Sequence, residues 1–166
     1  MTRNPLKPKL LPFTVALCVS LSLVGGGVLL AQLLHLAACP LCVIQRMLYL
    51  LLALAAGSGL VLAASPLARM IAALAMTAIA AAGSGVAAYQ VWIQRFAPNT
   101  TCAAEMPWWE AFVEWAGRLV PMLFQPNGLC SDPAWKLLGL SIAEWSLLCF
   151  FALFLLGLFS LLRKIP

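Results

Sequence analysis

The stretch HLAACPLCVIQRM, residues 35–47, places two cysteines three positions apart within a long apolar part of the chain. Proline is favoured at the first position of an α-helix, so we expect a helix to begin at Pro40 with Cys39 as its N-cap. Most of this stretch belongs to the charge-free run from Leu10 to Gln45, which is too long to cross a membrane only once. The sequence therefore predicts one helix before residue 37, a tight turn over about 37–42, and a second helix after it.

The amino-acid composition indicates that the chain is a membrane protein. Of its 166 residues, 64% are hydrophobic and only 9% are charged, far from the average soluble domain. A helix needs about 20 apolar residues to cross a bilayer. Stretches without charge predict spans at about 13–36, 43–64, 70–94 and 144–162. We expect one all-α membrane domain over residues 1–166, a four-transmembrane-helix bundle.

The basic residues predict the orientation, because Lys and Arg favour the cytoplasmic ends of spans. With both termini cytoplasmic, the inner side carries Arg3, Lys7, Lys9, Arg69, Arg163 and Lys164 and no acidic residue. The loops at about 37–42 and 95–143 then lie outside. The net charge of +5 therefore reports topology and not nucleic-acid binding. The first apolar run exceeds a secretory signal in length, so we expect it to persist as a helix.

The long outer loop contains a second pattern, between Pro107 and Pro121. Residues at helical spacing form one apolar face there, namely Trp109, Phe112, Ala116 and Leu119. Charged residues occupy the other face. An amphipathic helix of about residues 108–120, rich in tryptophan, favours a position flat on the membrane surface. The alternative is a helix that packs on a small core of the loop itself.

Six cysteines fall into two groups. Cys18 and Cys149 lie within spans, where a buried thiol is inert. The other four, Cys39, Cys42, Cys102 and Cys130, all lie on the predicted outer side, which argues for disulfides. Three pairings of four cysteines are possible.

The position of the first pair indicates redox chemistry. Cys39 and Cys42 would sit at the positive end of a helix dipole, which favours thiolate over thiol. Arg46, four residues after Cys42, would add a positive charge on the same face or hold a negative partner. A zinc site is disfavoured because the other two cysteines are far apart and His35 is the only histidine. A structural brace, for example Cys39 with Cys102, or a passive bond between Cys102 and Cys130, stays open.

The combined pattern closely resembles the bacterial DsbB family of disulfide bond formation proteins. It consists of Cys-x-x-Cys with Arg46 at the start of the second span, a widely spaced cysteine pair in the long loop, and WKLLGL at 135–140 before the last span. The resemblance covers about residues 13–162. It implies a bacterial inner-membrane thiol:quinone oxidoreductase with its redox loops in the periplasm.

The resemblance also implies roles for single residues. The disulfide between Cys102 and Cys130 would be attacked by a reduced periplasmic DsbA-like oxidase, with the mixed disulfide on Cys102. Cys39 and Cys42 would then reoxidise the loop pair, and Cys42 would react with ubiquinone or menaquinone supported by Arg46. No metal is implied.

The sequence departs from the family pattern at two places, one single residue and one pair of residues. Gln45 stands where members often have an acidic residue, and Tyr89-Gln90 stands where they often have Arg-His. Gln90 is nevertheless a candidate quinone-binding residue. A quinone reductase of the vitamin K epoxide reductase type is a second hypothesis, but its Cys-x-x-Cys falls late in the chain. A third is a disulfide-braced membrane scaffold without catalysis.

Overall fold

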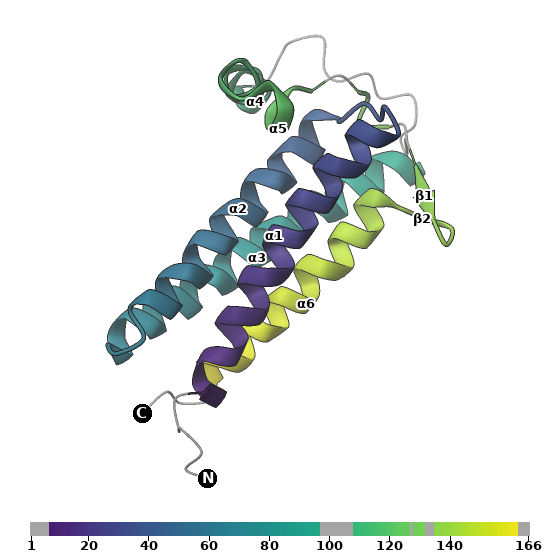
Figure 1. Ribbon diagram of the computed structural model, residues 1–166. Helices are drawn as coiled ribbons and strands as arrows, with labels where there is room; N and C mark the ends of the chain where they lie inside the picture. The colour runs from purple at the N-terminus through teal and green to yellow at the C-terminus, as the bar shows by residue number, and fades with distance from the viewer. Residues whose placement is uncertain (1–6, 97–107, 127, 132–134, 163–166) are drawn as a thin grey trace.

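A computed structural model describes residues 7–96, 108–126, 128–131 and 135–162. Its helices are α1 (Lys7–Leu33), α2 (Pro40–Val61), α3 (Pro66–Phe96), α4 (Trp108–Leu119), α5 (Pro121–Phe124) and α6 (Ile142–Leu162), and its strands are β1 (Lys136–Leu137) and β2 (Leu140–Ser141). Figure 1 shows α1, α2, α3 and α6 side by side as a bundle. The smaller elements gather at one end, opposite Lys7 and Leu162.

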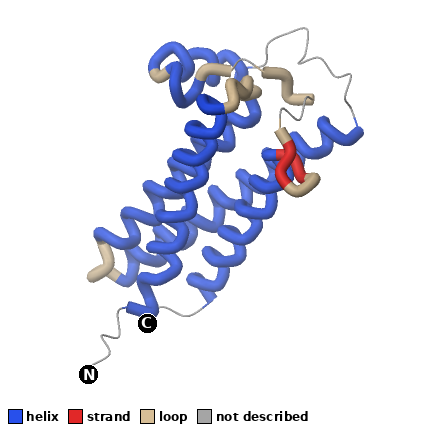
Figure 2. The backbone as a smooth tube through the Cα atoms, turned by 45° about the vertical axis from the view of Figure 1, so that its right-hand side comes forward, coloured by secondary structure: helices blue, strands red, loops and turns tan. Residues whose placement is uncertain are grey.

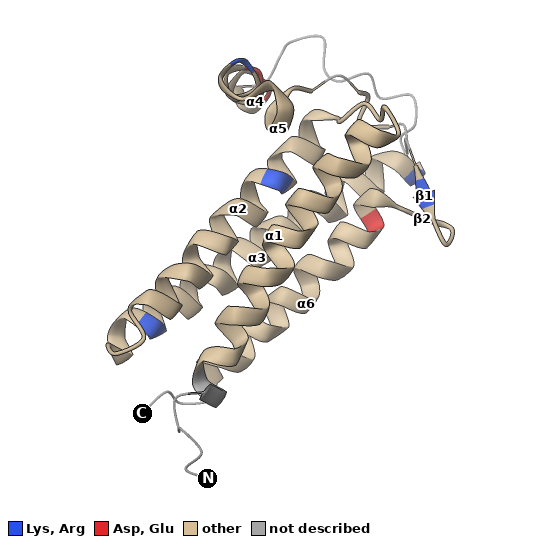
Figure 3. Cartoon of the chain, viewed as in Figure 1, with Lys and Arg blue, Asp and Glu red and all other residues tan. Residues whose placement is uncertain are grey.

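Four helices, α1, α2, α3 and α6, are long and apolar enough to cross a membrane. Figure 3 colours the charged residues on the ribbon, and they lie toward the two ends of the bundle with long uncharged stretches between them. The prediction of an all-α protein with four membrane-spanning helices is confirmed, and the chain is a multi-pass membrane protein.

Small residues allow the helices to approach closely. A Cβ on Gly59 of α2 would lie 2.5 Å from the ring of Phe13 in α1. A Cβ on Gly83 of α3 would overlap the ring of Phe150 in α6. Both phenylalanines are fully buried. In lipid, where burial of apolar area gives helices little reason to associate, such tight packing is a main source of stability.

The helix limits differ from the expected spans by a few residues. The expected third span begins at residue 70, directly after the charge of Arg69. The α3 helix instead begins at Pro66, a favoured first residue, and includes Arg69, which is only 5% exposed. The first expected span ran to residue 36, but α1 ends at Leu33.

The turn after α1 brings the chain back toward the bundle. His35 has a φ of 51°, the left-handed conformation that ends many helices. The backbone N–H of Leu36 donates to the carbonyl of Ala31 at 2.9 Å, as in a Schellman motif. Because α1 ends this tightly, residues 37–39 run directly into the first turn of α2.

The predicted loop helix is present as α4, and its position on the membrane surface stays a prediction. Figure 1 shows α4 nearly end-on, so that it crosses the direction of the bundle beside the end of α2. Val113 and Ala116 are buried, and Trp109 is partly buried. The exposed apolar side chains of this helix are Trp108, Phe112, Trp115 and Leu119. Phe112 and Leu119 therefore face away from the protein.

A short hairpin precedes α6, drawn as the two strands in Figure 2. Leu137 pairs with Leu140, and the two residues between them, Leu138 and Gly139, both have positive φ, as in a type I′ turn. Trp145 then donates from its indole nitrogen to the carbonyl of Leu137 at 3.1 Å, which fastens the hairpin to α6.

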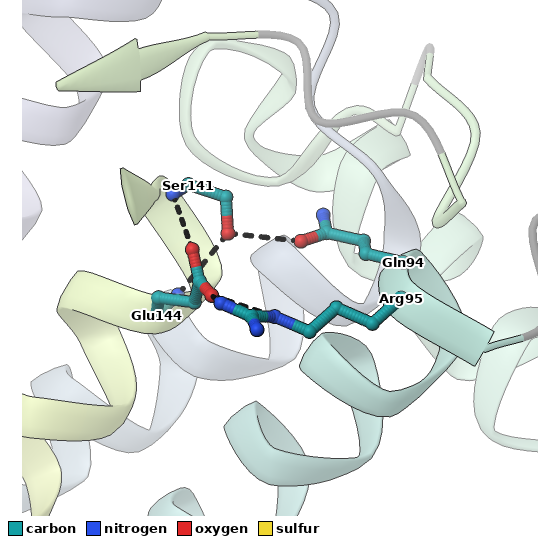
Figure 4. Close-up of polar contacts among 4 residues, drawn as sticks. All are labelled: Gln94, Arg95, Ser141 and Glu144. Atoms are coloured by element: carbon teal, nitrogen blue, oxygen red, sulfur yellow. Dashed lines mark hydrogen bonds and ion pairs between the residues drawn. The ribbon is translucent and has the colours of Figure 1, made fainter. Parts of the chain in front are cut away.

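The start of α6 is tied to the end of α3, as Figure 4 shows. Ser141 and Glu144 form a capping box, in which the Ser141 N–H donates to Glu144 Oε2 at 2.7 Å and the Glu144 N–H donates to Ser141 Oγ at 3.3 Å. Ser141 Oγ also donates to Gln94 Oε1 at 2.9 Å, and Arg95 forms an ion pair with Glu144. These contacts hold the hairpin near the N-terminal end of α2.

Candidate redox site

The first cysteine pair lies at the N-terminus of α2, where it was expected. Cys39 is the N-cap residue, and its sulfur accepts the backbone N–H of Cys42 at 3.3 Å. The N-cap and third helical positions share one face, so the two Sγ atoms lie 2.7 Å apart and form a hydrogen bond. This dithiol is close enough to form a disulfide without a change in the helix.

A loop cysteine meets the dithiol from the other side. Cys130 is buried in one cluster with Cys39, Leu41 and Ile93, and it hydrogen-bonds the Cys39 side chain. Trp109 of α4 packs against the same cluster. Cys102, the other predicted loop cysteine, lies outside the described residues.

A close backbone contact brings Cys130 to this position. The N–H of Gly128 donates to the carbonyl of Ala38 at 3.0 Å. A Cβ on Gly128 would lie 2.6 Å from the carbonyl oxygen of Ala37, so only glycine allows this approach without displacement. The loop is thereby held against the turn just before Cys39.

The surroundings of Cys39 favour its thiol form. The hydrogen bond with Cys130, that with Cys42, and burial together raise the pKa of Cys39 well above its usual range. The expectation that the helix dipole favours thiolate at both sulfurs is therefore wrong for Cys39. Burial away from water and contact with two other sulfurs outweigh the partial charge of the helix end.

Gln90 lies directly against the dithiol. Its Nε2 is 3.2 Å from the Sγ of Cys39 and 3.2 Å from that of Cys42, and it donates to both. Its Oε1 accepts a hydrogen bond from Nε2 of Gln45 at 2.7 Å. The side chains of both glutamines are buried. The two positions that depart from the family pattern are thus in contact with each other.

Arg46 joins the site to the loop. Its Nη1 donates to the backbone carbonyl of Leu123 in α5 at 3.0 Å. The guanidinium is partly buried and lies one turn beyond Cys42 on α2. Arg46 therefore combines two features, a position near the dithiol and an anchor for the segment that follows α4.

A cavity of about 390 Å³ opens beside the dithiol. Its walls come from α1, α2, α3, α6 and the loop end, and include Cys39, Cys42, Gln45, Arg46 and Gln90 together with Gly26, Leu30, Tyr49, Ser146 and Cys149. Most of the lining is apolar, and among its polar groups Gln90 lies directly against the sulfurs. Such a chamber fits an apolar molecule with a few polar atoms.

Tyr49 adds a polar hydroxyl group to the cavity wall, about two helical turns beyond Cys42. Its ring stacks on Phe150 with 3.9 Å between centroids, and its hydroxyl donates to the carbonyl of Ser146 at 3.2 Å. Sequence reasoning missed this residue, although it lies seven positions beyond Cys42 and hence on the same face of α2. It also missed Gly128, for which a glycine two residues before a cysteine was the only signal.

These features define a class: a multi-pass membrane protein whose dithiol lies between an apolar cavity and a loop cysteine. Comparison with known proteins gives the family. The family model described as Disulfide bond formation protein DsbB matches residues 9–160, so the chain belongs to the DsbB family, as the motifs predicted. Membership supports a disulfide oxidoreductase role.

Curated relatives cover nearly the whole chain. Disulfide bond formation protein B of Dechloromonas aromatica is 39% identical over 148 residues, which is 87% of each chain. Its namesake from Nitrosospira multiformis is 32% identical over 163 residues, 97% of this chain and 96% of the relative. That of Aromatoleum aromaticum is 35% identical over 148 residues, 88% of each.

Proposed function

We propose that this protein reoxidises a periplasmic DsbA-like thiol oxidase by disulfide exchange and passes the electrons to ubiquinone or menaquinone in the lipid bilayer. The observation that carries the proposal is that one dithiol contacts both a loop cysteine and an apolar cavity. Cys39 contacts the loop cysteine Cys130, while Cys42 lines the apolar cavity. A single site can thus exchange disulfides with a water-soluble partner through the loop. It can also pass electrons to a lipid-soluble acceptor through the cavity.

The proposed exchange has four steps, and the contact between Cys130 and Cys39 supports the second of them. A thiolate of the reduced partner attacks Cys102 of a Cys102–Cys130 disulfide and releases Cys130. Cys130 attacks Cys39 of a Cys39–Cys42 disulfide, which breaks that bond and releases Cys42. The second thiol of the partner then displaces Cys102, so the partner leaves oxidised. The Cys102 thiolate attacks Cys130 and restores the loop disulfide, which leaves Cys39 and Cys42 reduced.

The acceptor completes the cycle. The dithiol of Cys39 and Cys42 gives two electrons and two protons to one quinone, which becomes a quinol as the disulfide returns. A strongly oxidising thiol oxidase needs an acceptor of higher potential, and a quinone meets that requirement. The cavity suits such a molecule, because Gln90 lies 3.2 Å from each sulfur, Arg46 adds a charged group to the wall, and most of the lining is apolar.

The proposed location is the bacterial inner membrane, with both termini cytoplasmic and the dithiol on the periplasmic side. The excess of basic residues on the side of the termini supports this orientation. The exposed Trp108, Phe112, Trp115 and Leu119 of α4 lie at the same end of the bundle as the dithiol. We infer that this face rests in the membrane surface and keeps the loop near the site.

The test uses the full-length chain purified in detergent, a reduced DsbA-like protein and a short-chain ubiquinone or menaquinone, with quinone absorbance as the readout. The proposal predicts turnover by the unaltered chain and its loss in Cys42→Ser. Cys18→Ser is the matched control, because Cys18 is exposed on α1 and should be dispensable. Full turnover by a folded Cys42→Ser protein contradicts the proposal.

The order of the relay has a separate test. A DsbA-like variant that lacks its second active-site cysteine should be trapped as a mixed disulfide on Cys102, found by peptide mass analysis. An adduct only on Cys39 would reverse the proposed order.

A further inference from the structure

We propose that Gln45 and Gln90 form an amide clamp on the dithiol: Gln90 is a catalytic residue that donates a hydrogen bond to each sulfur, and Gln45 is a positioning residue that decides which end of the Gln90 amide faces them. The inference rests on the proposed function of Cys39 and Cys42, which it deepens. The clamp makes and breaks no covalent bond.

The hydrogen-bond capacity of Gln90 matches its surroundings. A primary amide has two N–H donors on one side and a carbonyl acceptor on the other. Nε2 of Gln90 lies 3.2 Å from each of the two sulfurs, so the N–H side of the amide faces the dithiol. The carbonyl side is occupied by Gln45 Nε2 at 2.7 Å. Gln90 is 2% exposed, so water does not substitute for these contacts.

The direction of the Gln90 amide decides which state of the sulfurs it favours. A thiolate accepts hydrogen bonds but has no proton to donate, so only the N–H end can stabilise it. The carbonyl end would instead accept the proton of a thiol and hold it in place. Reversal of the amide would bring the Gln90 nitrogen against the nitrogen of Gln45, two donors without an acceptor between them. As long as Gln45 presents its Nε2, it therefore keeps the N–H end of Gln90 on the sulfurs.

The clamp differs from the other polar groups around the dithiol. The titratable or charged side chains that share its surroundings are Arg46 and Tyr49 of α2, Cys149 of α6, and Cys130 of the loop. Within the described part of the chain, α1 and α3 add none to the cavity wall. Arg46 donates to Leu123. An amide neither gains nor loses a proton near neutral pH, so Gln90 offers the same donors throughout that range.

The experiment measures thiolate reactivity without quinone or partner. The full-length chain is reduced, and its alkylation by iodoacetamide is followed between about pH 5 and pH 10, with Cys39 and Cys42 resolved by peptide mass analysis. Gln90→Met keeps the side-chain length but removes both donors. We expect Cys42 alkylation to slow about tenfold at pH 7 and the midpoint of its pH profile to rise by about one unit.

Gln45 is tested through a double-mutant cycle. Gln45→Met leaves the donors of Gln90 but no longer orients them, so we expect an effect of about threefold, smaller than that of Gln90→Met. Because Gln45 acts only through Gln90, the double variant should equal Gln90→Met alone. Full additivity would overturn the positioning role.

The matched control is Gln32→Met, an exposed glutamine on α1 that should leave the profile unchanged. Retained helicity by circular dichroism identifies folded variants. An unchanged pH profile in folded Gln90→Met overturns the clamp, and an equal shift in Gln32→Met does so too. Because the assay contains no acceptor, a chain that fails to reduce quinone can still show the clamp, which separates the two proposals.

Discussion

Gly128 donates its backbone N–H to the carbonyl of Ala38 at 3.0 Å, and this bond joins the long loop to the turn before α2. The contact lies two residues from Cys130 and one from Cys39. It therefore positions the two cysteines that the proposed exchange requires to meet.

Gly128→Val should separate the two cysteine pairs. A Cβ at this position would lie 2.6 Å from the Ala37 carbonyl oxygen, so the loop must move away. Misplacement of reacting groups by about 1 Å can cost up to about 100-fold in rate. We expect oxidation of the partner to slow by about 10- to 100-fold, with the reaction of the pre-reduced dithiol with quinone unchanged.

Single-turnover kinetics of the two half-reactions would check this result. Gly57→Val is a suitable control, because no atom lies within 4 Å of a Cβ built there. Equal slowing of both half-reactions by Gly128→Val would mean that the substitution disturbs the whole site and would count against the positioning argument.

Much of this arrangement could be predicted from local sequence. Runs without charge longer than a bilayer crossing predicted the four spans, and Pro40 after Cys39 predicted the start of α2. These signals are local because helices satisfy their own backbone hydrogen bonds. The third charge-free stretch begins after Arg69, while α3 begins earlier, because a charged residue can continue a helix past the apolar stretch.

The contacts at the site were beyond local reasoning. Gln45 and Gln90 are 45 residues apart and meet only because α2 packs on α3. Cys130 meets Cys39 because the loop docks through Gly128, and four cysteines alone allow three pairings. The raised pKa of Cys39 likewise follows from its hydrogen bonds with Cys130 and Cys42. The argument from the helix dipole did not include these contacts.

The raised pKa of Cys39 predicts its reactivity. A thiol with a raised pKa stays protonated at neutral pH, so in the reduced chain Cys39 should resist alkylation at pH values where an ordinary cysteine reacts. The hydrogen bond with Cys130 is the largest cause of the shift. Cys130→Ala should therefore lower the pKa of Cys39 and speed its alkylation at pH 8.

Peptide mass analysis after timed exposure to iodoacetamide measures this change. Cys18→Ala should leave Cys39 as it was, because Cys18 is exposed on α1 away from the cluster. Rapid alkylation of Cys39 in the unaltered chain would refute the prediction.

Arg46 should stabilise α5 locally. A hydrogen bond from a charged donor to a carbonyl contributes up to about 3 kcal/mol, and partial exposure reduces this to about 1 kcal/mol. Arg46→Met should therefore speed amide hydrogen exchange in residues 121–125 about fivefold. Arg95→Met, which removes the ion pair with Glu144, should affect the start of α6 and leave α5 unchanged. Protection of α5 that is equal in both variants would exclude the anchoring role.

Gly83 should be the most sensitive small residue of the bundle. A Cβ there would overlap the ring of Phe150, which is fully buried and stacked on Tyr49 at 3.9 Å, so the ring cannot yield without disturbing the cavity wall. Overpacking of this kind costs about 1–3 kcal/mol. Gly83→Ala should thus lower the thermal unfolding midpoint in detergent by about 2–10 °C. It should also weaken quinone binding through the displaced Tyr49. Gly85→Ala, a control two residues further along α3 in open space, should change neither the unfolding midpoint nor quinone binding. An equal midpoint in Gly83→Ala and Gly85→Ala would show that α3 and α6 are not in close contact at Gly83.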